Sequence, residues 1–270
     1  MIGWLSLAAD RQRALNRFGG LDGPLIIHET TCVSCQGFVM PQEKRDQADP
    51  RRVNRHALAA QDELWDEMLT LASVVDSMLH QAVQILCERR TELAAAVKAQ
   101  ERTINEWEVR IEERCIQALA LYEPVATDLR RMVSMLKLRR HLERVSNLAM
   151  KIARRSKRFA DDPLASPIPA SLVILAVAVT DAFGVVIAAL SGDDTAAARS
   201  VIFGEEAIDR QQQLVLRELK NELRHHPEQV TPLLQLMNSA RNLESVGDHT
   251  VNIAETIIFI KEGLGHTLPS

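Results

Sequence analysis

The chain has 270 residues, of which 25% are charged and 46% hydrophobic, and its formal net charge is −4. This composition is typical of a soluble globular protein, and the small acidic excess argues against nucleic acid as a partner. Aromatic residues make up only 4%, which favours packed helices over a β-sandwich. Four cysteines are too few for a disulfide scaffold, so we expect a reducing compartment.

The N-terminal residues 1–55 differ from the rest of the chain. They contain Gly19-Gly20, Gly23-Pro24, Pro41 and Pro50, and they show no sustained helical period. We therefore expect an irregular N-terminal extension. An alternative is that translation begins at Met40 and that residues 1–39 arise from the choice of start site.

The remaining sequence has a helical hydrophobic period to its end. We predict six helices, at about 58–89, 91–120, 127–159, 170–190, 194–225 and 228–262. A run rich in Asp and Pro, from 161 to 169, is typical of a linker. No segment alternates with period two for long enough to predict a strand. We therefore expect an all-α protein with two units of three helices, residues 56–163 and 167–264.

The segment 168–190 is long enough to cross a bilayer and contains one charge, Asp181. An ionised carboxylate near the middle of a membrane span is costly, and Pro169 and Gly184 interrupt the segment. We therefore expect no transmembrane segment. The interpretation that we favour is a central helix buried on nearly all sides by its neighbours.

An internal repeat organises the predicted helices. Residues 140–153 read RHLERVSNLAMKIA and residues 241–254 read RNLESVGDHTVNIA, which align at an offset of 101 residues. The preceding helices align at an offset of 104, which matches Glu101 with Glu205. A repeat of this size indicates two copies of one supersecondary unit.

This arrangement resembles the PhoU family of regulators of bacterial phosphate transport. The resemblance rests on the motif Leu243-Glu244-Ser245-Val246-Gly247-Asp248, followed by Asn252-Ile253, and on its altered first copy, which begins at Leu142-Glu143. It covers about residues 58–263 and implies two tandem three-helix bundles.

The resemblance also implies a function. Members of the family are not enzymes. They couple a phosphate ABC transporter, through its ATPase subunit, to a phosphate-sensing histidine kinase, and they repress phosphate-starvation genes when phosphate is plentiful. We therefore expect a cytoplasmic negative regulator, a homodimer, held at the inner membrane through its partners. Family members can bind divalent or ferric metal on the bundle surfaces, so iron, zinc, manganese and magnesium are all candidates.

Acidic residues at four-residue spacing predict such a metal site in the second unit. A spacing of four places side chains on one face of a helix, and hard cations prefer carboxylate and amide oxygens. The predicted ligands are Glu205, Asp209, Glu244, Asp248 and Asn252, with Asp181 as a further candidate. The alternative is a solvated acidic face with salt bridges to Arg210, Arg241 or Lys261.

The first unit departs from this pattern. The corresponding residues are Glu101, Asn105, Glu143, Asn147 and Lys151, so two acids become amides and a lysine replaces Asn252. A lysine can neutralise carboxylates as a metal does. We therefore predict a weak or absent metal site there, with Lys151 paired to Glu143 or Glu101.

A different class of function is a carboxylate-ligated metalloprotein unrelated to phosphate, for metal storage or oxidation. Di-iron oxidases of the helical-bundle type use Glu-x-x-His pairs that project into the core. The ladder Glu244, Asp248 and Asn252 contains no such pair, so we keep this function only as the alternative.

Overall fold

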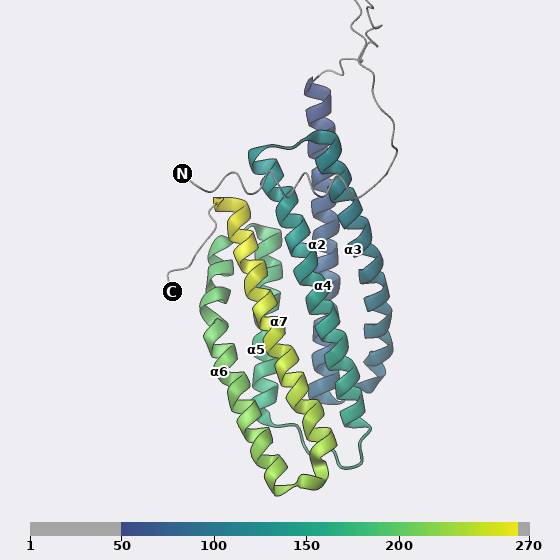
Figure 1. The fold of residues 1–270 in the computed structure, drawn as a ribbon, viewed down its shortest axis with the longest axis vertical. Coiled ribbons are helices and arrows are strands. Elements are labelled where there is room, and N and C mark those ends of the chain that lie inside the picture. The colour runs from purple at the N-terminus through teal and green to yellow at the C-terminus, as the bar shows by residue number, and fades with distance from the viewer. Residues whose placement is uncertain (1–49, 264–270) are drawn as a thin grey trace, which may run out of the picture. The chain divides into compact units, whose positions relative to one another are not determined.

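The computed structural model describes residues 50–263, and all regular elements in this range are helices (Figure 1). The first repeat comprises α2 (Pro50–Glu88), α3 (Ala94–Tyr122) and α4 (Ala126–Ala160). The second comprises α5 (Ala170–Gly192), α6 (Thr195–His225) and α7 (Val230–Glu262). Short 3₁₀ turns, Thr91–Leu93 and Pro227–Gln229, precede α3 and α7. The prediction of an all-α fold with two tandem three-helix bundles is confirmed.

The first helix begins earlier than predicted. It starts at Pro50, whereas the predicted start was about residue 58, within the stretch expected to be irregular. Proline suits the first position of a helix, because its fixed φ is helical and its missing N–H has no partner there anyway. The other helix ends lie within three residues of the prediction. The rest of the predicted extension, residues 1–49 with Met40, lies outside the described residues.

The two bundles share one core. Helix α4 packs along α7, as Figure 1 shows, and α2 packs against α5. The buried side chains of both repeats therefore form one continuous hydrophobic cluster. Leu142 of α4 and Leu243 of α7, which are equivalent in the repeat, both have 0% exposed surface. The repeated motif thus supplies core residues as well as candidate ligands.

Two histidines meet where α4 packs on α7. Nδ1 of His141 lies 3.4 Å from Nδ1 of His249. Burial and, second, the neighbouring His249 lower the pKa of His141 to about 4, so the ring is neutral at physiological pH. His249 therefore faces α4, in keeping with its helical position beside Asp248 and not on the ligand face.

Helix α5 is less enclosed than predicted. Ala57–Glu88 and Ala170–Gly192 are both long and apolar enough to cross a membrane, which many core helices of soluble proteins also are. Helix α5 packs on α2, α6 and α7, as expected of a core helix. However, Ile174, Val177 and Val185 expose 57%, 48% and 41% of their surface. The prediction that this helix is buried on nearly all sides was therefore wrong. These residues share one face with Asp181, and none of the three packed helices covers that face.

Candidate metal centre

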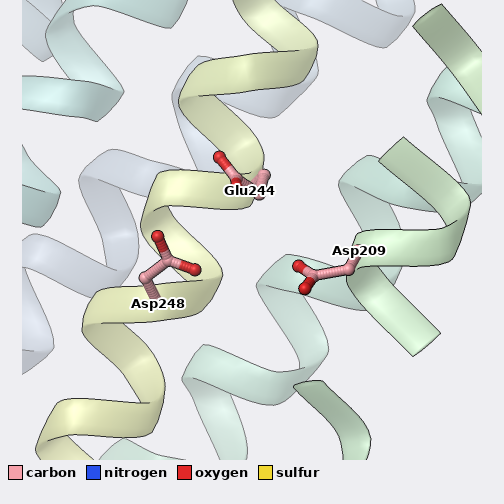
Figure 2. A group of neighbouring side chains, drawn as sticks. All are labelled: Asp209, Glu244 and Asp248. Carbon is pink, nitrogen blue, oxygen red and sulfur yellow. The ribbon is translucent and has the colours of Figure 1, made fainter. Parts of the chain in front are cut away.

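Three carboxylates from two helices converge in the second repeat. Glu244 and Asp248 lie one turn apart on α7, and Asp209 reaches toward them from α6 (Figure 2). One oxygen from each of the three lies within 4.8 Å of the others. We call these three residues the acidic triad. Two E-x-x-x-D ladders on adjacent helices thus produce the predicted convergence.

Close packing of α6 on α7 brings the triad together. Gly247, which precedes Asp248, is buried against Ile208, which precedes Asp209. A Cβ at position 247 would lie 3.3 Å from Cγ2 of Ile208, which is tighter than ordinary van der Waals contact. The glycine of the motif therefore allows an α6 side chain to sit directly on the α7 backbone beside the carboxylates.

The electrostatics of the triad favour a bound cation. Partial burial, followed by repulsion from Asp248 and Asp209, raises the pKa of Glu244. Burial and the charge of Asp209 likewise raise the pKa of Asp248. Like charges at this range repel, and a cation between them would remove that penalty.

The salt bridges of the alternative interpretation are not found. Arg210 pairs with Glu206 on its own helix, and Lys261 pairs with Asp193. No triad carboxylate has an ion pair with Lys or Arg among residues 50–263. The triad is therefore not a neutralised surface cluster within the part of the chain that the structure describes.

The other three predicted ligands do not belong to the triad. Glu205, one turn before Asp209, has a pKa raised by burial and then by the charges of Asp209, Asp248 and Glu255. Asn252 turns its amide onto the helix, where Nδ2 donates to the backbone oxygen of Asp248 at 2.6 Å. Asp181 is exposed on α5 and does not belong to the triad.

Glu255 was not predicted, although it contributes to the same electrostatic cluster. It lies seven residues after Asp248, and a spacing of seven returns to the same helix face. Its charge raises the pKa of Glu205. Extending the four-residue ladder by this spacing would have found it.

The residues present suit a hard cation. Three carboxylates supply oxygen ligands and enough negative charge for a divalent or ferric ion, and water would complete the coordination. Asp209, Glu244 and Asp248 would hold the ion. A bound metal would supply positive charge that fixes α6 against α7.

The first repeat does not form an equivalent cluster. Among residues 50–263, no other group of three acidic, histidine or cysteine side chains lies close enough to hold a metal. Glu143, the counterpart of Glu244, instead lies near Glu108 of α3. Glu108 is 6% exposed, and its Oε1 has no hydrogen-bond partner. Burial, then the charge of Glu143, raises the pKa of Glu108 to about 7.

Lys151 does not have the partners that we predicted. It forms no ion pair with Glu143 or Glu101 in the described part of the chain. It lines a cavity with Arg154, Arg155 and Arg158. These residues follow it by three, four and seven positions and so share its helix face.

Comparison with known proteins supports one family. The model of the PhoU domain matches residues 68–156 and 172–257, once in each bundle. The chain is 30% identical over 202 residues to a protein of Pseudomonas putida named phosphate-specific transport system accessory protein PhoU homolog, covering 75% of this chain and 79% of that one. A homologue of the same name from Caulobacter vibrioides is 28% identical over 196 residues, covering 73% and 85%.

Solved structures agree with this match. The crystal structure of PhoU from Pseudomonas aeruginosa superposes with a TM-score of 0.73 at 29% identity, covering 76% of this chain and 99% of that one. That of the phosphate transport system regulatory protein PhoU from Streptococcus pneumoniae gives 0.71 at 22% identity, covering 78% and 100%. The second similarity shows the fold alone.

Proposed function

Because this chain belongs to the PhoU family, we propose that it is a non-enzymatic negative regulator of phosphate uptake and of phosphate-starvation signalling. The observation that carries the proposal is the match over both bundles to relatives named as accessory proteins of phosphate-specific transport systems. The proposed role is to couple a phosphate ABC transporter, through its ATPase subunit, to a sensor histidine kinase at the cytoplasmic face of the inner membrane.

The fold suits a protein that acts by docking. Both repeats retain a fully buried core, whereas among the described residues only the second has an acidic triad. An adaptor tolerates such a loss, because its faces bind proteins and do not have to carry out chemistry. The exposed apolar side chains of α5 offer one such face, since exposed apolar surface marks interaction sites. We propose that the protein acts as a homodimer.

We propose that metal at the acidic triad is a structural or regulatory element of this adaptor. The support is the convergence of three carboxylates without a Lys or Arg ion pair among residues 50–263, with raised pKa values for Glu244 and Asp248. A cation there would couple the position of α6 to that of α7, and so would change the surface offered to a partner.

Metal storage or oxidation unrelated to phosphate is less well supported. Oxidase sites of helical bundles project into the core, whereas none of Asp209, Glu244 and Asp248 is fully buried. Glu222 and His225 have the Glu-x-x-His spacing, but they lie at the C-terminal end of α6, where His225 is exposed.

The regulatory role can be tested by deleting the gene in its own organism and measuring phosphate uptake and a phosphate-responsive reporter in phosphate-rich medium. We expect both to rise, and we expect the wild-type gene to restore them. Uptake and reporter activity that stay unchanged after deletion would contradict the proposal.

A further inference from the structure

A basic groove lies along the last turns of α4. Lys151, Arg154, Arg155 and Arg158 line a cavity of about 250 Å³. Arg154 also lines an adjoining cavity of about 430 Å³ between α4 and the start of α3. Arg154 lines both cavities, and we call the two together the basic groove.

The positive charge of this groove is not neutralised by the protein. None of Lys151, Arg154, Arg155 and Arg158 has an ion-pair partner in the range 50–263. Nε of Arg155 is shielded from solvent and has no hydrogen-bond partner. Among the residues that line the two cavities, Glu101 is the one acid, and it lines only the wider cavity.

Helix stability does not explain all of these cations. Positive side chains near a helix C-terminus interact favourably with the helix dipole, but the effect is confined to the last turn. Helix α4 ends at Ala160, so this accounts for Lys157 and Arg158. Lys151 and Arg154 lie before the last turn, nine and six residues from the end of the helix, and gain little from it.

The two repeats differ in charge at these positions. At the offset of 101 residues, Lys151 corresponds to Asn252 and Arg154 to Glu255. Arg155 corresponds to Thr256 and Arg158 to Phe259. These four positions therefore carry one acid in the second repeat and four cations in the first.

We propose that this basic groove binds a phosphate group. A guanidinium is planar and offers paired N–H donors that match two oxygens of one phosphate, whereas lysine adds a point charge. Three arginines and one lysine on one face of α4 can contact a dianion together beside a cavity of about 250 Å³.

The wider cavity suits the rest of an organic phosphate. Its walls include Ala94, Ala95, Met150 and Ala153, which offer apolar surface to a ring or carbon chain. The Glu101 carboxylate, in the same wall, can accept hydrogen bonds from hydroxyl groups. The ligand is thus either free phosphate in the narrow cavity or a nucleotide that fills both cavities.

Calorimetric titration of the full chain with inorganic phosphate and, separately, with ATP tests this proposal. EDTA is present throughout, so that no metal at the acidic triad can bridge to the anion. The test variant, Lys151→Asn with Arg154→Glu, installs the residues of the second repeat. The control, Lys220→Asn with Arg217→Glu, makes the same charge change at exposed positions three residues apart on α6.

We expect at least one of the two anions to bind the wild type and the control, and binding to the test variant to weaken at least tenfold. ATP binding at least tenfold tighter than phosphate identifies an organic phosphate as the ligand, whereas similar affinities identify free phosphate. The proposal is overturned if neither anion binds the wild type, if the test variant binds normally, or if the control weakens equally.

Discussion

The third helices of the two repeats, α4 and α7, share one sequence motif but carry opposite charges at equivalent exposed positions. Both bury the same motif leucine, Leu142 in α4 and Leu243 in α7. On the exposed face, Asn147 and Arg154 of α4 stand where α7 has Asp248 and Glu255. The core of each copy is constrained by packing, whereas its surface is free to acquire a separate role.

The two repeats also differ in where their carboxylates lie and in which charged groups surround them. In the second repeat the carboxylates converge at the surface and have no ion pairs with Lys or Arg in the described part of the chain. In the first, Glu108 is buried beside Glu143, and Arg139 lies close enough to lower its pKa in part. Arg139 stands where the second repeat has Ala240. The first repeat thus has a cation beside its acids, whereas the triad has no Lys or Arg ion pair in the described part of the chain.

Truncating the shared core should give the largest effect, and the same effect in both repeats. Leu142→Ala and Leu243→Ala each leave a cavity at a site with 0% exposure, so each should cost about 2–5 kcal/mol of unfolding free energy. Urea denaturation measures this cost. Leu214→Ala, at a position 49% exposed, is the control and should change stability by less than about 0.5 kcal/mol. A loss confined to one repeat would contradict a shared core.

Metal should stabilise the protein through the second repeat alone. At a concentration about 100-fold above its Kd, a ligand of the folded state adds about 2.7 kcal/mol, or roughly 5–10 °C in Tm for a chain of this size. Thermal melts with and without Mn²⁺ should show this shift in the wild type and in Glu143→Gln. The shift should be absent in Glu244→Gln with Asp248→Asn; its persistence there would place the site elsewhere.

The buried acid of the first repeat should make its stability depend on pH. The pKa of Glu108 in the folded protein is raised to about 7. Its carboxyl group therefore does not lower the stability below the ordinary pKa of 4.5, and it lowers the stability fully above pH 7. Glu108→Gln, which gives the residue found at position 212, should therefore be more stable than the wild type at pH 8, by about 1–3 kcal/mol. Denaturation at pH 8 and pH 5 checks this, and an advantage that does not shrink at pH 5 would contradict it.

Charge repulsion in the metal-free acidic cluster should give the smallest effect. The pKa of Glu205 is raised, so its ionised form costs stability as the pH rises. Glu205→Gln in EDTA at pH 8 should therefore be more stable by a few tenths of a kcal/mol, because like-charge pairs at helix surfaces are worth about that much. Glu206→Gln removes the partner of Arg210 and is the control, which should gain nothing.

The sequence predicts the fold and the convergence of the triad because both depend on helical periodicity. Core leucines and the acids Glu244 and Asp248 recur at spacings of three, four and seven, which place them on defined faces. The internal repeat then shows which helices are equivalent. The start of α2 at Pro50 escaped this reasoning, because the first turns of a helix need no apolar period.

Features that depend on neighbouring helices could not be predicted in this way. The sequence suggested that Lys151 would neutralise Glu143, whereas Lys151 lines a cavity with three arginines of its own helix. The burial of Glu108 likewise depends on which face of α3 meets α4. The open face of α5 could not be read from its composition, since an apolar helix can be covered on two sides or on all.

Metal content measured by mass spectrometry tests the contrast between the two repeats most directly. The comparison uses the wild type, Glu244→Ala with Asp248→Ala, and the first-repeat counterpart, Glu143→Ala with Asn147→Ala, all reconstituted with iron, zinc or manganese. We predict at least one equivalent of metal in the wild type and in the first-repeat variant, and none in the second-repeat variant. No metal in the wild type, or equal loss in both variants, would contradict the assignment of the metal site to the acidic triad.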